Sequence, residues 1–133
     1  MIPISKPIDL ALLLLRLAMG GFMIYGHGWP KLLRLFGEAD IRFLDFMGLG
    51  PNISLSLAVF AEVICSLLVM TGCYTRLAVL PLIFTMGVAA FVANAGQPFA
   101  DMEKALLFLV SFVVIGIAGA GWYSIDARFR NHI

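Results

Sequence analysis

Four basic side chains share one face of an apolar stretch near the beginning of the chain. A helix advances by about 100° per residue, so Arg16, His27, Lys31 and Arg34 fall within about 60° of one another around its axis. Gly20 falls on the same stripe. Guanidinium, imidazole and ammonium groups donate hydrogen bonds, so the stripe suits an anion or the carbonyl oxygens of a quinone. Charges at membrane depth usually face a bundle interior or a wet cavity, so we expect the stripe to face other helices.

Glu62 is the only charged residue in the second apolar run, residues 53–70. At about 1.5 Å per helical residue, Arg16 and Glu62 both fall in the middle third of a hydrocarbon core about 30 Å thick. No other opposite charge lies at that depth, so we predict that these two side chains pair and form the floor of an intramembrane pocket. Glu62 would then orient Arg16 or relay protons. An internal pair with a purely structural role is the alternative.

Two further polar residues follow, Asn94 at the end of the third apolar run and Glu103 in the connection after it. An asparagine near a helix end also serves as a cap or as a hydrogen bond between helices, and this alternative stays open for Asn94. The candidate pocket then comprises Arg16, Gly20, His27, Lys31, Glu62, Asn94 and Glu103.

The sequence predicts neither a metal site nor a haem. His27 and His132 are far apart, and no helix carries the Glu-x-x-His spacing of carboxylate metal sites. A haem held by His27 would lack a second axial ligand in the membrane. Cys65 and Cys73 are too far apart along a helix for a disulfide, which needs Cα atoms roughly 4.4–6.8 Å apart. We expect both to remain thiols, and the absence of a C-x-x-C motif disfavours a thiol-exchange enzyme.

Composition indicates one compact membrane domain over residues 1–133. The chain is 62% hydrophobic and 13% charged, whereas soluble domains are about 25% charged. A net charge of +1 without a long basic tail argues against nucleic-acid binding. The N-terminus lacks the basic region and cleavage site of a signal peptide, so we expect the first helix to be retained.

Four apolar runs predict an all-α fold, an integral membrane four-helix transmembrane bundle. The predicted spans are residues 10–29, 53–71, 77–95 and 105–121. The very short turn at residues 71–76 makes the second and third spans antiparallel neighbours. Pro30 is expected to kink or end the first helix, leaving residues 31–36 as a separate amphipathic turn.

These residues also carry a resemblance to a known family. The segments LLLLRLAMGGFMIYGHGWPKLL, AVFAEVICSLLVMTGCYTRLA and GAGWYSIDA, with the stretch from Asp101, resemble the motifs of the DoxX family in the same order. The resemblance implies a four-helix protein of the inner membrane. Some relatives are the membrane subunit of thiosulfate:quinone oxidoreductase, and others belong to membrane redox and oxidative-stress assemblies. The family's motif positions fall on Arg16, Gly20, His27, Lys31, Glu62, Arg76, Glu103, Ser124 and Asp126.

The leading interpretation is a membrane redox-associated subunit with an intramembrane pocket for a quinone or a small anion. Two alternatives stay open: a non-catalytic membrane scaffold or chaperone that binds partner helices, and a small-solute carrier. The sequence does not decide whether the protein is an enzyme.

We expect a multi-pass protein of a bacterial-type inner membrane, in contact with the lipid bilayer. So small a bundle exposes much apolar surface, so a homo-oligomer or a complex with a soluble or membrane redox partner is expected. Four basic residues lie on each side of the predicted bundle, so this count leaves its orientation open. If Lys31 and Arg34 point into the bundle, the terminal side is the more basic, and we predict cytoplasmic termini.

Overall fold

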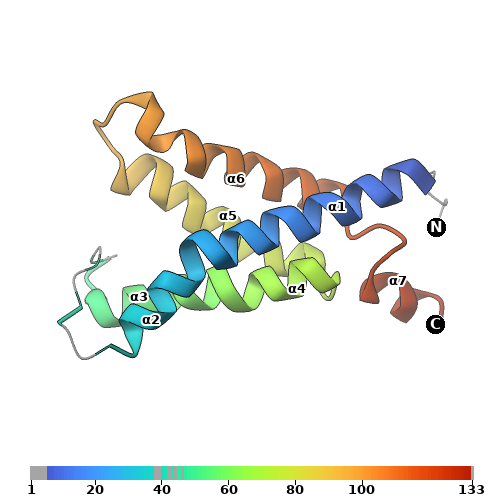
Figure 1. Cartoon of the computed structure of the whole chain (residues 1–133), viewed down its shortest axis with the longest axis horizontal. Helices are drawn as coiled ribbons and strands as arrows, with labels where there is room; N and C mark the ends of the chain where they lie inside the picture. Colours follow the sequence, from blue (N-terminus) through green and yellow to red (C-terminus); the bar gives the residue numbers. More distant parts are fainter. Residues whose placement is uncertain (1–5, 38–39, 42, 44, 46, 133) are drawn as a thin grey trace.

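The computed structural model describes residues 6–37, 40, 41, 43, 45 and 47–132. In this part of the chain there are four long helices and no strand, and successive long helices run in opposite directions (Figure 1). Both described ends, the turn between the second and third long helices and the end of the fourth lie at one end of the bundle, here called the terminal end.

The long helices are built from shorter elements. The first consists of α1 (Lys6–Met23), the π-helical η1 (Ile24–Gly28) and α2 (Trp29–Leu35). The second consists of α3 (Pro51–Val59), the π-helical η2 (Phe60–Cys65) and α4 (Ser66–Thr71). The third consists of α5 (Thr75–Val88) and the π-helical η3 (Ala89–Ala93). The fourth is α6 (Phe99–Ala118), and the short α7 (Ile125–Arg130) follows it.

Three of these helices are long and apolar enough to cross a membrane, namely Lys6–Leu35, Pro51–Thr71 and Thr75–Ala93. The fourth, α6, has 20 residues but carries Asp101, Glu103 and Lys104 in its first turns. The predicted all-α membrane fold is therefore confirmed. By length and composition, helices that can span a membrane are found at three of the four predicted spans within the described residues.

Pro30 does not separate residues 31–36 from the first long helix, so that part of the prediction is wrong. Helical backbone continues through Pro30 to Leu35, because Pro30 lies in the first turn of α2, directly after η1. The Trp29 N–H donates to the Ile24 carbonyl, five residues back. The missing N–H of proline thus falls where the hydrogen-bonding pattern changes, and the helix is not broken there.

The turn at the terminal end is tight, as its length predicts. Gly72 adopts a left-handed conformation with φ of 72°, which ends α4, and the Cys73 N–H donates to the Leu68 carbonyl. The second and third long helices are consequently antiparallel neighbours.

A buried apolar cluster joins the long helices. Its members are Met23, Cys65, Val69, Ala78, Val79, Leu82, Met86, Phe108, Phe112 and Ile115. Large apolar side chains also cover the outer faces of the bundle, Tyr25, Phe84 and Ile117 among them. In a bilayer those outer faces contact lipid, while the cluster fixes how the helices present their polar residues inward.

Candidate functional site

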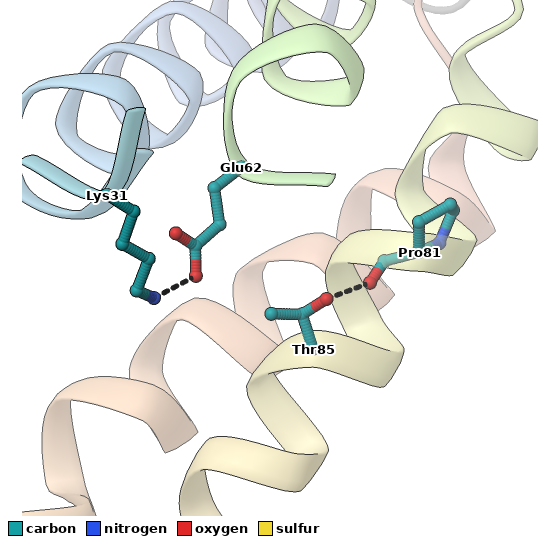
Figure 2. A network of polar contacts seen from close by, with 4 residues as sticks. All are labelled: Lys31, Glu62, Pro81 and Thr85. Atoms are coloured by element: carbon teal, nitrogen blue, oxygen red, sulfur yellow. Dashed lines mark hydrogen bonds and ion pairs between the residues drawn. The ribbon is translucent and has the colours of Figure 1, made fainter. Parts of the chain in front are cut away.

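Lys31 and Glu62 form an ion pair between the first and second long helices. The Lys31 Nζ atom lies 2.6 Å from the Glu62 Oε1 atom. The Glu62 side chain is fully buried, and the Lys31 side chain is 22% exposed. Figure 2 shows the ammonium and the carboxylate pointing toward one another from α2 and η2. The predicted pair between Arg16 and Glu62 is therefore wrong, since the partner of Glu62 is Lys31.

Position along the bundle explains the change of partner. Arg16 in α1 and Lys31 in α2 both bond to the second long helix, but they are separated by about 22 Å of helix. Arg16 therefore meets Val69 and Met70 in α4, and Lys31 meets Glu62 in η2.

Gly28 allows the two helices to approach closely beside this ion pair. A β-carbon at Gly28 would lie 2.7 Å from Val63 Cγ2 and 3.0 Å from the Glu62 carbonyl oxygen. Real side chains do not tolerate such distances, so only glycine fits here without displacing η2. Helix packing therefore explains the glycine of the H-G-x-x-K motif, which lies three residues before the lysine of the ion pair.

The ion pair lies at the wall of a cavity of about 460 Å³, a volume within the range of small-molecule sites. Its walls come from α2, α3, η2, α5 and η3, together with the connection before α3. The lining residues are Lys31, Phe43, Leu49, Ser54, Leu57, Ala58, Phe60, Ala61, Glu62, Pro81, Phe84, Thr85, Val88, Ala89 and Ala93. Most of this surface is apolar, and the two charges are confined to one place.

The cavity opens through the apolar outer surface of the bundle. Leu57, Phe60 and Phe84 line it, yet each is more than half exposed, with 53%, 51% and 58% of its surface free. Side chains exposed on the sides of membrane helices face lipid. A molecule dissolved in the hydrocarbon could therefore reach the cavity sideways, without crossing an aqueous phase.

Two of the π-helical segments form part of the cavity wall. Phe60, Ala61 and Glu62 belong to η2, and Ala89 and Ala93 belong to η3. Segments of this kind are uncommon and frequently occur at functional sites. Sequence reasoning found Lys31 and Glu62 by their charge but missed the small residues opposite them. The signal available for the third long helix was the spacing of Pro81, Thr85, Val88 and Ala89 on one helical face.

Arg16 lies away from the cavity, toward the terminal end. Its guanidinium is fully buried and donates from Nη1 to the carbonyls of Val69 (3.3 Å) and Met70 (3.4 Å). Nη2 donates to the Tyr123 carbonyl at 2.5 Å. The acceptors at 69 and 70 lie in the last turn of α4, where most carbonyls lack intrahelical partners, although Val69 also accepts the Gly72 N–H at 3.2 Å. Arg16 thus satisfies a helix end and holds the closing segment of the chain.

Gly20 is a packing residue of the same helix contact. A β-carbon at Gly20 would overlap Met70 Cγ and lie 3.0 Å from the Ser66 carbonyl oxygen. This close approach of α1 to α4 is the use of small residues that is typical of membrane helices.

The other candidate residues also lie outside the cavity lining. His27 is half-buried and packs edge-on against Phe108 of α6, with the ring centroids 5.4 Å apart. Asn94 ends η3 and donates from its side chain to the Ala89 carbonyl at 2.8 Å, which is the capping alternative. Glu103 is exposed on α6. Of the predicted pocket residues, the structure places Lys31 and Glu62 on the cavity wall.

The closing motif G-x-G-x-x-S-x-D forms a hydrogen-bonded cap at the terminal end. The Asp126 carboxylate accepts the N–H groups of Tyr74 (2.7 Å) and Thr75 (2.9 Å), which start α5. Ser124 caps α7 by accepting the Ala127 N–H at 3.1 Å. These residues hold the starts of α5 and α7 in place, and they lie far from the ion pair along the bundle.

Cys65 and Cys73 are free thiols, as expected. Within the described residues no group of three or more His, Cys, Asp or Glu side chains is arranged to hold a metal ion. That the protein uses neither metal nor haem stays a prediction.

Comparison with protein families agrees with this arrangement. The DoxX family model matches residues 11–95, which include both members of the ion pair and all of the cavity-lining residues. No curated protein and no solved structure matches the chain significantly. Because the matched segment covers more than half of the chain, the protein is a member of the DoxX family.

Proposed function

We propose that this protein is a redox-associated membrane component that binds a quinone in the cavity beside Lys31 and Glu62. The observation that carries the proposal is the combination of an apolar cavity of about 460 Å³ with one polar point on its wall. Ligand sites for quinone-like molecules need this division, since an apolar ring and tail surround a few polar oxygens.

The charge balance of the site favours a neutral ligand over a small anion. Lys31 is already paired with Glu62 at 2.6 Å, so the polar end of the cavity has no net charge. A bare anion would lose its hydration among apolar walls without gaining a free cation, which is costly. A quinone has no charge to desolvate, and its carbonyl oxygen can accept one of the remaining N–H bonds of the Lys31 ammonium.

The lateral opening of the cavity also favours a quinone over a small anion. Quinones with hydrocarbon tails reside in the bilayer, and the exposed side chains of Leu57, Phe60 and Phe84 surround the opening. Membership of the DoxX family adds a membrane location and a frequent association with redox systems. Electrons would come from a soluble or membrane partner, and we propose a bacterial-type inner membrane as the setting.

A cavity-filling substitution tests the proposal. Ala89 lines the cavity on η3, and Val92 lies three residues later on the same segment with 54% of its surface exposed. Ala89→Phe should fill the space and sharply reduce binding of a decyl-substituted benzoquinone, measured by native mass spectrometry of the purified protein. Val92→Phe introduces the same ring on the lipid side and should bind as the wild type does.

Two outcomes would count against a quinone. Equal quinone occupancy in Ala89→Phe and wild type would place binding elsewhere. A stoichiometric co-purified protein without any bound small molecule would favour the scaffold or chaperone alternative, in which the exposed apolar faces bind partner helices.

A further inference from the structure

The part of the chain that follows α6, residues 119–130, is here called the closing segment. The Asp126 N–H donates to the Gly72 carbonyl at 2.8 Å. The Asp126 carboxylate accepts the N–H groups of Tyr74 and Thr75. These contacts attach the segment to the turn between two helices that are long and apolar enough to cross a membrane. The closing segment therefore lies where the ends of those helices meet the lipid headgroups, at the terminal end (Figure 1).

The beginning of the closing segment is attached to the bundle through its backbone. The Trp122 N–H donates to the Asp9 carboxylate at 2.9 Å, and the Tyr123 carbonyl accepts from the buried Arg16 guanidinium. The aromatic side chains of Trp122 and Tyr123 are nevertheless exposed. The bundle thus holds both rings on its outside, at the depth where tryptophan and tyrosine are enriched in membrane proteins.

The short helix α7 adds an apolar face that is directed away from the bundle. Ala127 is buried, whereas Ile125 and Phe129 are exposed. At about 100° per residue, Ile125 and Phe129 lie on one side of the helix, roughly opposite Ala127. With the two aromatic rings they form an exposed apolar surface next to the ends of the membrane-spanning helices. Such a surface is buried when it lies in the interface of a bilayer.

Among the described residues, acidic and basic side chains of the terminal end point in different directions. Asp9 and Asp126 accept backbone N–H groups of the protein itself. Arg76, Arg128 and Arg130 are exposed. Arg76 lies beside the beginning of the closing segment, since its Nη2 donates to a carbonyl in the last turn of α6 at 3.4 Å, and the other two arginines belong to α7. The exposed apolar surface is therefore accompanied by cationic groups.

From this arrangement we propose that the closing segment is an interfacial anchor that binds anionic phospholipid. The exposed rings lie among the lipid headgroups and the adjoining acyl chains, and the arginines bind phosphate. A guanidinium offers a planar fork of N–H donors that matches phosphate oxygens, and basic groups beside an interfacial apolar face favour anionic lipid. Free phosphate would use the arginines and leave the rings uncovered, whereas a lipid has a part for each.

This inference goes beyond the proposed quinone site and does not depend on it, because no residue of the closing segment lines the cavity. Trp122 can report on the lipid beside the segment. The chain has two tryptophans, so Trp29→Phe leaves Trp122 as the single fluorophore. Brominated lipids quench tryptophan fluorescence on contact.

The test reconstitutes this single-tryptophan protein in phosphatidylcholine nanodiscs with increasing fractions of brominated phosphatidylglycerol. A parallel series uses brominated phosphatidylcholine. We expect the anionic lipid to quench Trp122 at a clearly lower mole fraction than the neutral lipid. High salt should reduce this difference, because exposed charges are screened.

Two arginine variants test the basic residues. Arg128→Gln should lower the preference for the anionic lipid about fivefold, and Arg128→Gln with Arg130→Gln should lower it about fivefold again. Replacing both arginines by lysine keeps the charge and should keep most of the preference. Lys104→Gln is the matched control, since it removes one exposed basic group from the first turns of α6, at the opposite end of the bundle. It should behave as the wild type does.

Three outcomes would overturn the proposal. Equal quenching by the two lipids would do so, and the basic surface would then suit an acidic partner protein. A preference that survives both arginine replacements and high salt would also do so. An equal loss in Lys104→Gln and Arg128→Gln would mean that the preference reflects the total charge of the protein and not the closing segment. Each of these results leaves the proposed function standing.

Discussion

The Arg16 guanidinium is hydrogen-bonded at 2.5 Å to the carbonyl of Tyr123, a residue 107 positions later in the chain. The same guanidinium donates to Val69 and Met70 at the end of α4. One buried side chain therefore joins the first helix, the end of the second long helix and the closing segment. Its surroundings leave no room, because a β-carbon at Gly72 would overlap Arg16 Nη1. Arg16 is thus a structural centre of the terminal end.

Arg16→Met should strongly destabilise the protein. It leaves the Met70 and Tyr123 carbonyls without this donor, and each acceptor left unpaired costs roughly 1–3 kcal/mol. The Val69 carbonyl keeps the Gly72 N–H as a donor. Thermal unfolding in detergent, followed by tryptophan fluorescence, should show a much lower midpoint. Arg128→Met removes an exposed arginine of α7 and should unfold close to the wild type. An unchanged midpoint for Arg16→Met would show that these carbonyls do not depend on the guanidinium.

Asp126→Ala should weaken the connection between α7 and α5. The carboxylate accepts from the Tyr74 and Thr75 N–H groups, and loss of such a helix cap costs about 0.5–2 kcal/mol. The expected result is a lower unfolding midpoint with quinone binding retained, because the cap lies at the terminal end. Asp101→Ala, at an exposed position in the first turn of α6, is the control. A loss of ligand binding at full stability would contradict this purely structural role.

The two adjacent glycines of α1 offer a matched pair of variants. Gly20→Val drives a side chain into Met70 and the Ser66 carbonyl, whereas a β-carbon at Gly21 meets nothing within 4 Å. We expect Gly20→Val to lower the yield of folded, monodisperse protein in size-exclusion chromatography, and Gly21→Val to have little effect. Equal yields from the two variants would mean that α1 and α4 are not so closely packed.

Hydropathy sufficed to predict the membrane fold, because long apolar runs and a short turn leave few arrangements. It also identified Arg16 and Glu62 as buried charges, and both are fully buried. The partners of these two charges could not be predicted, since the pairing was inferred from depth in a bilayer alone. Hydropathy does not show which basic residue of the first helix lies level with Glu62: this residue is Lys31, whereas Arg16 lies level with the end of α4.

The cavity was only half predictable for the same reason. Lys31 and Glu62 were recognised by charge, but the wall opposite them consists of small and apolar residues such as Ala89 and Val88. In a membrane helix such residues are ordinary, and their joint position depends on packing among three helices. The assignment of residues 1–133 to one domain stays a prediction.

We predict that the termini face the cytoplasm. The terminal end has the basic residues Lys6, Arg76, Arg128 and Arg130. The opposite end has as many, but its Lys31 is paired with Glu62 and so contributes less to orientation. Single cysteines at residues 130 and 37, introduced after Cys65 and Cys73 are replaced by Ala, report the sides. An impermeant thiol reagent applied to intact cells should label residue 37; labelling at residue 130 instead would reverse the orientation.

Replacing Lys31 should cost more stability than replacing Glu62, its partner in the ion pair. Lys31→Met leaves the fully buried Glu62 carboxylate without a counter-ion, which typically costs 3–5 kcal/mol. Glu62→Leu leaves a lysine that is 22% exposed and can turn toward solvent or head groups, so its cost should be smaller. Thermal unfolding of the two single variants in detergent should therefore place Lys31→Met clearly below Glu62→Leu.

The double variant Lys31→Met with Glu62→Leu should recover most of the lost stability, because an apolar replacement of both charges leaves neither unpaired. Arg16→Met with Glu62→Leu should recover nothing, since Arg16 donates to backbone carbonyls and has a separate role. Recovery by the second pair and not by the first would restore the pairing of Arg16 with Glu62. If the Lys31–Glu62 double variant folds but no longer binds quinone or quinol, the pair serves the ligand beyond its contribution to stability.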